Sequence, residues 1–110
     1  MTNSRAKGKR GELEAAAALR KHLGIEARRG QQYHGGSDAP DLRHSLPGIH
    51  IEVKRVERLN LDQAMDQAQR ESGSNTPLVL HRRNRRPWLV TVRLEDLLAV
   101  ARVLSGEGLL

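Results

Sequence analysis

Apolar and polar side chains alternate strictly in the middle of the chain. Residues 49–54 read Ile-His-Ile-Glu-Val-Lys, so the apolar residues fall on one face of a predicted strand and the polar residues fall on the other. Glu52 and Lys54 therefore point the same way. The pattern puts a carboxylate and an ammonium side by side on one face of this strand.

Longer spacings of apolar residues predict three helices. The first covers residues 8–23, is rich in Ala and Leu and ends at Gly24. The second covers residues 61–72, with Asn60 as its cap and Gln63 at the capping-box position. The third covers residues 94–104 and closes the fold. Its apolar face consists of Leu94, Leu97, Leu98, Ala101 and Leu104.

Four further apolar segments predict strands, and together with the helices they define an α/β fold. They cover residues 25–29, 41–44, 78–80 and 88–92. The resulting order is helix, three strands, helix, two strands, helix. We expect one domain over residues 1–110, with flexible tails at residues 1–7 and 105–110.

Two carboxylates are predicted to converge on the strand formed by residues 49–54. If residues 41–44 form a hairpin with residues 49–54 through a turn at Pro47-Gly48, Asp41 lies beside Glu52. Two like charges at that distance are stabilised by a hard divalent cation such as Mg²⁺ or Mn²⁺. Asp38 competes for the same place, but Asp41 follows Pro40 at the start of an extended segment and is the better candidate.

Glu12 is a third candidate acid. It falls in the middle of the apolar stripe of the first helix, where a carboxylate is costly unless it is paired or binds a metal. Alternatively, Glu12 interacts with the helix dipole near the N-terminus and extends its carboxylate into solvent.

Composition indicates a polyanionic partner. The 110 residues include 19 Lys and Arg against 13 Asp and Glu, a formal net charge of +6. Nucleic acid is the first candidate and a membrane surface the second, although no apolar segment approaches the length of a span and no signal peptide is expected. With one Trp, one Tyr and no Phe, base stacking is a poor binding mode, so phosphate contacts should dominate. The absence of Cys is compatible with a reducing cytoplasm.

Arginines cluster at the predicted turn between the last two strands. Residues 82–86 read Arg-Arg-Asn-Arg-Arg, and four guanidinium groups at one tip repel one another unless phosphates bind them. The alternative is a solvated basic turn that aids solubility. A glycine-rich segment, residues 30–39, lacks the spacing of a P-loop or dinucleotide fingerprint, so no nucleotide cofactor is expected. It should lie beside the site, with Arg28, Arg29 and Ser37 as donors to the substrate backbone.

Three other polar residues have open roles. Gln63 and Gln67 share one flank of the second helix, where either could donate to a phosphate or a site carboxylate, although simple exposure is the commoner outcome. His50 shares a face with Glu52 and Lys54 and could relay a proton. The remaining histidines are expected to be structural.

The element order with Glu12, Pro40-Asp41 and Glu52-Val53-Lys54 resembles the PD-(D/E)xK nuclease superfamily. Within it, the chain is most similar to small archaeal and phage Holliday-junction resolvases and to stand-alone virus-type replication-repair nuclease domains. The likeness covers residues 5–92, and the basic, glycine-containing residues 7–14 place Glu12 at the catalytic position of the archaeal resolvases. A second glycine-serine motif, found after the lysine in some virus-type domains, is absent.

The resemblance implies a restriction-endonuclease-like core in which a mixed central β-sheet is flanked by helices in the order αβββαββα. Asp41, Glu52, the main-chain carbonyl of Val53 and Glu12 would hold Mg²⁺ or Mn²⁺, and Lys54 would position or activate the attacking water. The implied activity is hydrolysis of phosphodiesters in branched DNA by a homodimer. A nickase or flap endonuclease of the same fold, or a non-catalytic DNA-binding module, are the alternatives. The implied DNA contacts are Arg5, Lys7, Lys9, Arg10, Arg28, Arg29, Ser37, Arg82, Arg83, Arg85 and Arg86.

Overall fold

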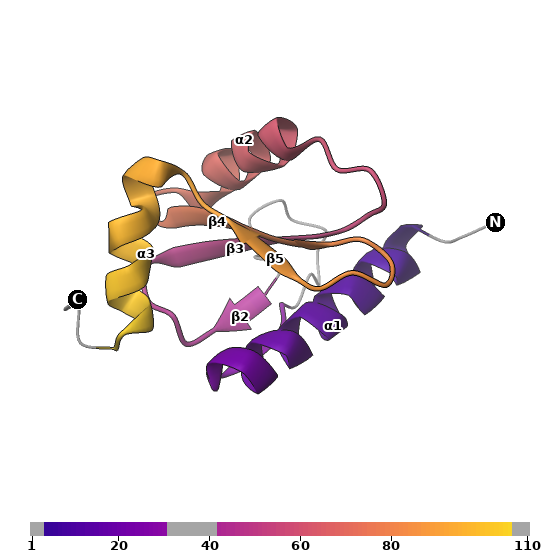
Figure 1. Ribbon diagram of the computed structural model, residues 1–110, viewed down its shortest axis with the longest axis horizontal. Coiled ribbons are helices and arrows are strands. Elements are labelled where there is room, and N and C mark those ends of the chain that lie inside the picture. The colour runs from indigo at the N-terminus through magenta and orange to yellow at the C-terminus, as the bar shows by residue number, and fades with distance from the viewer. Residues whose placement is uncertain (1–3, 31–41, 107–110) are drawn as a thin grey trace.

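The predicted order of helices and strands is confirmed in the computed structural model, which describes residues 4–30 and 42–106 (Figure 1). The helices are α1 (Ser4–Leu23), α2 (Leu61–Ser72) and α3 (Leu97–Leu104), the last preceded by a 3-10 turn, η1 (Leu94–Asp96). The strands are β1 (Ala27–Arg29), β2 (Leu42–His44), β3 (Ile49–Arg55), β4 (Thr76–Arg82) and β5 (Leu89–Thr91). The first helix thus begins four residues earlier than expected, because the polar segment before Gly8 continues the helix.

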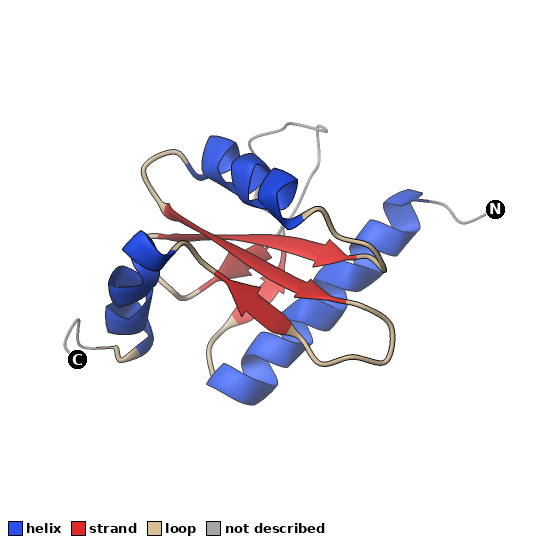
Figure 2. Cartoon of the chain, turned by 45° about the horizontal axis from the view of Figure 1, so that its top comes forward, coloured by secondary structure: helices blue, strands red, loops and turns tan. Residues whose placement is uncertain are grey.

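A mixed three-stranded sheet forms the centre, in the order β3-β4-β5. β3 and β4 run parallel, with Glu52 opposite Val79, and β4 and β5 form the predicted antiparallel hairpin. The parallel pair is possible because α2 carries the chain from the end of β3 back to the start of β4. Figure 2 shows the helices lying around this sheet.

The predicted hairpin between residues 41–44 and β3 is wrong in its pairing. β2 forms its ladder with β1, with Arg28 opposite Arg43, and β3 forms its ladder with β4. Pro47-Gly48 does make the turn that leads into β3, and Gly48 takes the left-handed φ of 73° that glycine favours. The local turn was therefore predictable, but the partner that each strand selects depends on tertiary packing.

The two faces of β3 pack against different helices. On one face, Ile51 and Val53 join Ala15, Ala16 and Leu19 of α1 in the larger of two apolar clusters. On the other face, Val79 of β4 packs with α2 in the smaller cluster. The alternation along β3 thus does not separate core from solvent. It places the apolar side chains of β3 under α1 and the polar side chains of β3 under α2.

The closing helix α3 does not bury the leucines that its apolar pattern predicts to face the core. The buried residue of α3 is Val100, with Val103 packed beside it against the larger cluster. Leu94 is 86% exposed and Leu98 is 55% exposed. The expected leucine face of this segment therefore points away from the core of the described chain.

Gly11 marks a close approach between α1 and β3. A Cβ atom at Gly11 would lie 2.8 Å from the Cβ of Arg55, whereas nothing lies within 4 Å of one at Gly8. We expect Gly11→Ala to lower the free energy of unfolding by about 1–2 kcal/mol, because the clash outweighs the gain in helix propensity. Gly8→Ala, the matched control, should raise it by up to about 1 kcal/mol. Denaturant unfolding measures both, and equal stabilisation by the two changes would contradict this contact.

Candidate metal and phosphodiester site

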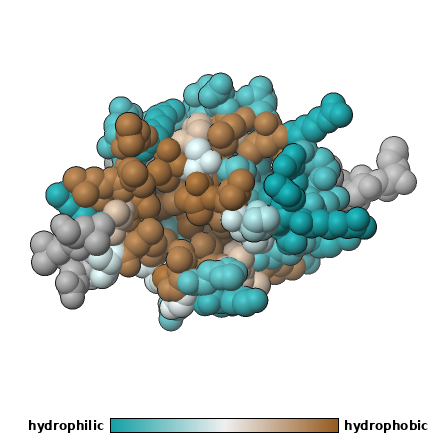
Figure 3. Space-filling view, viewed as in Figure 1, coloured by the Kyte–Doolittle hydropathy of each residue, from teal (hydrophilic) through white to brown (hydrophobic). Residues whose placement is uncertain are grey.

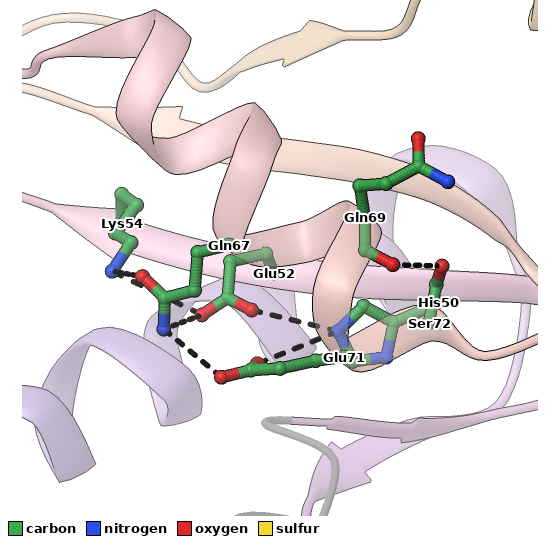
Figure 4. A network of polar contacts seen from close by, with 7 residues as sticks. All are labelled: His50, Glu52, Lys54, Gln67, Gln69, Glu71 and Ser72. Atoms are coloured by element: carbon green, nitrogen blue, oxygen red, sulfur yellow. Dashed lines mark hydrogen bonds and ion pairs between the residues drawn. The ribbon is translucent and has the colours of Figure 1, made fainter.

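The polar face of β3 carries the candidate site. Glu52 is only 2% exposed although it is a carboxylate, and His50 on the same face is also buried. Burying a charge is costly unless it is paired or bound, so the neighbours of Glu52 decide what it does. Those neighbours come from β3 itself and from α2, which lies across this face (Figure 4).

Lys54 and Gln67 hold one oxygen of the Glu52 carboxylate. The Lys54 Nζ lies 3.9 Å from Glu52 Oε2, and Gln67 Nε2 donates to the same oxygen at 3.3 Å. Lys54 Nζ also donates to Gln67 Oε1 at 2.8 Å. The three side chains form a closed triangle in which each polar group has a partner, so the ammonium and the carboxylate have fixed relative positions (Figure 4). The prediction that Glu52 and Lys54 share one face is confirmed.

His50 and Glu71 lie at the other oxygen of Glu52. His50 Nε2 is 3.5 Å from Glu52 Oε1 and 3.9 Å from Glu71 Oε2. One ligand atom from each of these three residues lies within 4.8 Å of the others, close enough to share one cation. Two carboxylates and an imidazole suit Mn²⁺ or a similar divalent ion, since hard oxygen donors dominate and imidazole is also a ligand for such metals.

Sequence reasoning missed Glu71 and underestimated Gln67. Both lie on α2 four residues apart, and Gln67 Nε2 also donates to Glu71 Oε1 at 3.2 Å. The expectation that Gln67 is a solvated surface residue is wrong, whereas Gln63 is exposed as expected. The available signal was the four-residue spacing, which places 63, 67 and 71 on one flank of the helix. The sequence did not show that this flank lies over Glu52.

Glu12 is buried and paired on the α1 side of the fold. Its Oε1 accepts a hydrogen bond from Arg29 Nε at 3.0 Å, and the residue is 8% exposed. The alternative in which this carboxylate extends into solvent is therefore wrong. Arg29 was predicted to donate hydrogen bonds to phosphate, and in the structure its Nε donates to Glu12. Asp41, its competitor Asp38 and Ser37 lie outside the described residues, so their predicted places stay predictions.

Basic side chains gather at the end of the sheet beyond Lys54. Arg10 of α1 and Asn84 of the β4–β5 turn line one shallow pocket of about 250 Å³, although they are far apart in the sequence. Lys9, Arg10, Arg83, Arg85 and Arg86 are all exposed. Figure 3 shows the hydrophilic surface concentrated at this N-terminal end of α1. The two basic segments of the sequence thus form one surface, which we call the basic end.

Arg82 differs from the other three arginines of the tip. It donates to Glu14 Oε1 at 3.1 Å and to the Arg86 carbonyl at 2.6 Å, and its guanidinium lies 6.0 Å from the centre of the Trp88 ring. Glu14 also accepts from Arg55 Nε at 3.1 Å. These contacts tie the tip to α1 and β3. Contacts within the chain therefore hold the Arg82 side chain, while its predicted contact with phosphate stays a prediction.

The turn itself carries backbone strain at Arg85. Its φ is 61°, in the left-handed region that glycine and asparagine prefer. An arginine there costs about 1 kcal/mol relative to an unstrained position. Arg85 is exposed in this conformation.

Two other histidines are partly buried and form hydrogen bonds within the fold. Burial lowers the pKa of His44, a hydrogen bond involving the Ile49 backbone partly offsets this, and the nearby His50 lowers it further. The Nδ1 of His44 accepts a hydrogen bond from the Leu46 backbone at 3.1 Å. Burial also lowers the pKa of His81, which lies 2.8 Å from Thr91 Oγ1.

One solved structure resembles this arrangement in its fold. It is Hjc, a Holliday junction resolvase from the archaeal hyperthermophile Archaeoglobus fulgidus, with a TM-score of 0.55 and 24% identity over 78% of this chain and 72% of that chain. The chain has the fold of this resolvase. That fold is restriction-endonuclease-like, as the sequence resemblance implied.

Sequence comparisons do not assign the chain to a family. No protein-family model matches the chain, and no curated protein matches it significantly. Within the described residues, no helix is long and apolar enough to cross a membrane. The features of this chain that bear on function are therefore its fold and the side chains that it places on that fold.

Proposed function

We propose that this chain is a divalent-metal-dependent endonuclease that hydrolyses phosphodiester bonds in branched DNA, as a Holliday-junction resolvase. The observation that carries the proposal is the buried Glu52 carboxylate with Lys54 fixed 3.9 Å away, on strand β3 of a fold shared with an archaeal resolvase. The structural likeness favours the resolvase type over the virus-type replication-repair nucleases, which no comparison supports.

The metal ligands in this proposal are those that the resemblance implies, Asp41, Glu52, the carbonyl of Val53 and Glu12, with Mg²⁺ or Mn²⁺ as the ion. Among the described residues Glu52 groups with His50 and Glu71, whereas Glu12 is hydrogen-bonded to Arg29 and would have to exchange that bond for the ion. His50 and Glu71 offer further donors to the Glu52 end of the site. A bound divalent ion would lower the pKa of a water ligand and offset negative charge developing on the scissile phosphate. The donor set fits such an ion, because oxygen donors predominate and two of the carboxylates, Glu12 and Glu52, are buried.

Lys54 would orient the attacking water. Its ammonium is held by Gln67 Oε1 at 2.8 Å and is partly exposed, so it can donate toward a substrate while it stays in place. The water attacks phosphorus, the bond from phosphorus to the leaving sugar oxygen breaks, and the leaving oxygen takes up a proton. Gln67 would act through Lys54 and Glu52 by keeping both side chains at fixed positions.

The basic end would bind the DNA backbone without reading sequence. Its exposed side chains are Lys9, Arg10, Arg83, Arg85 and Arg86. Arg55, which lines a pocket at this surface, follows Lys54 directly on β3. A two-fold homodimer would present two such sites to a four-way junction and cut two strands symmetrically. We place this activity in the cytoplasm of a bacterial or phage-infected cell, and no nucleotide cofactor takes part.

The test incubates the purified protein with labelled four-way junction, flap and linear duplex DNA, in Mg²⁺, in Mn²⁺ and in a chelator. We expect paired symmetric cuts on the junction, only in the presence of the metal. Cutting of the flap or single nicks in duplex DNA would instead identify the alternative nucleases of the same fold. If the protein binds these DNAs but cuts none of them in either metal, the remaining interpretation is a non-catalytic DNA-binding module.

A further inference from the structure

A pocket of about 490 Å³ opens between the segment that joins β3 to α2 and the turn that joins β4 to β5. We call it the leucine pocket. Its apolar walls include Leu59 and Leu61 on the α2 side and Pro87 and Leu89 on the side of the turn. Leu61 is 37% exposed and Leu89 is 55% exposed, so the fold itself does not cover these walls. A pocket of this volume can hold a small molecule or one group of a larger one.

The leucine pocket lies next to the candidate site. His81, which lines the pocket, is opposite Lys54 in the parallel ladder, and Leu89 is opposite His81 in the antiparallel ladder. Residues opposite one another on neighbouring strands point to the same face of the sheet, and the strands lie about 4.8 Å apart. Lys54, His81 and Leu89 therefore form one row across the sheet, which leads from the candidate site into the pocket.

Contacts within the chain hold the two sides of the pocket together. The Glu57 carboxylate accepts a hydrogen bond from the backbone N–H of Asn84 at 2.7 Å, which ties the segment before α2 to the β4–β5 turn. The same carboxylate lies 3.8 Å from Arg55 Nη1. Within the turn, Arg82 Nε donates to the Arg86 carbonyl at 2.6 Å. The pocket is therefore formed in the free chain, and a ligand does not have to order it.

Charge indicates what the pocket binds. Arg58, Arg83 and Arg86 line it and are exposed, whereas the carboxylate of Glu57 already contacts Asn84 and Arg55. Apolar walls with arginines beside them suit a ligand that has an apolar body next to negative charge.

A nucleotide within a DNA strand has both features, because its base lies between two phosphates. A guanidinium group can bind a phosphate and can also stack on a base. The row that leads from Lys54 into the pocket favours such a nucleotide over an acidic peptide, because a strand that passes Lys54 reaches the pocket.

We propose that the leucine pocket takes up one unpaired base of the bound DNA, while Arg58, Arg83 and Arg86 contact the phosphates beside that base. The identity of the ligand as DNA rests on the proposed function. Moving a base out of its stack costs free energy, and the cost is least where the base is already unpaired. The pocket would therefore favour branched DNA over a continuous duplex without reading its sequence.

The test compares two DNA duplexes that differ by one base. One carries a single unpaired adenine, and the other carries an abasic site at the same position, so that the backbone charges are identical. Fluorescence anisotropy in a chelator measures binding without cleavage. The wild-type chain should bind the duplex with the unpaired adenine roughly tenfold more tightly, near the low end of what stacking of one base on an aromatic side chain contributes.

Leu61→Ser/Leu89→Ser removes apolar walls of the pocket without changing the charge of the chain. The difference between the two duplexes should fall to within about twofold in this variant, because the base loses its apolar contacts. The matched control is Leu23→Ser/Leu94→Ser, at two leucines outside the pocket that are 47% and 86% exposed. The control should keep the tenfold difference, and circular dichroism checks that both variants are folded.

Equal affinity of the wild-type chain for the two duplexes would contradict the pocket, and this comparison needs no variant. A tenfold difference that persists in Leu61→Ser/Leu89→Ser would also contradict it, because the base would then be bound elsewhere. Micromolar binding of free deoxyadenosine monophosphate, lost in the same variant, would instead identify a site for free nucleotides.

Failure of the proposed function is distinguishable from failure of the pocket. A chain that binds the unpaired adenine more tightly but cuts no junction keeps the pocket and loses the enzyme. A chain that cuts junctions but binds the two duplexes equally keeps the enzyme and loses the pocket. A chain that binds no DNA would overturn both.

Discussion

Replacing Glu52 with Gln should reduce junction cleavage by roughly 1,000-fold while DNA binding stays within about twofold, as expected when one metal-binding carboxylate is neutralised at an otherwise intact phosphoryl site. Glu52 is buried between Lys54, Gln67 and His50, so the amide occupies the same space but cannot supply the charge that a divalent ion needs. Binding persists because the basic end is a separate surface. Single-turnover cleavage and fluorescence anisotropy in a chelator measure the two effects.

The matched control is Asp66→Asn. Asp66 is an exposed carboxylate on the same helix as Gln67 and Glu71, and it lies 3.8 Å from Arg93. The same loss of charge there should leave the cleavage rate within about twofold, as for an ordinary surface substitution. Glu71→Gln should fall between the two if Glu71 contributes a ligand. If the Glu52→Gln variant retains a tenth of the wild-type cleavage rate, Glu52 is not a ligand of the metal.

The local chemistry of this site was predictable, but its surroundings were not. The period-two pattern of β3 puts Glu52 and Lys54 on one face whatever the tertiary structure, because successive side chains of a strand point to opposite faces. Gln67 and Glu71 join them only because α2 crosses that face, which depends on the parallel pairing of β3 with β4. A sequence shows a helix flank but not the surface over which that flank lies.

The errors in the fold have related causes. A hairpin between residues 41–44 and β3 follows from turn chemistry at Pro47-Gly48, yet β2 pairs with β1, a choice made by packing rather than by the turn. The leucine pattern of α3 predicts a buried face, yet Val100 takes the core position. Periodicity reports that a face is apolar and does not say whether its own chain or another chain covers it.

Removing three arginines of the tip should weaken DNA binding and flatten its dependence on salt. For Arg83→Ala/Arg85→Ala/Arg86→Ala, we expect affinity to fall roughly 100-fold or more at about 0.1 M salt and the slope of log affinity against log salt to fall by roughly 2–3, because each lost phosphate contact removes about 0.9 of the slope. All three side chains are exposed, and Arg82 is left in place because it holds the tip to Glu14. Junction, flap and duplex should be affected alike.

The control removes the same three charges elsewhere, at Lys21, Arg70 and Arg102, which are exposed and distant in sequence from the tip. It should change affinity by less than about tenfold, since charges that make no phosphate contact act only through the screened long-range field. Titrations of a labelled junction at several salt concentrations give both slopes. Equal slopes for the two triple variants would show that binding depends on net charge alone, and the strained φ of Arg85 would then have no role in holding DNA. A flatter slope only for the tip variant would place the phosphate backbone against the basic end.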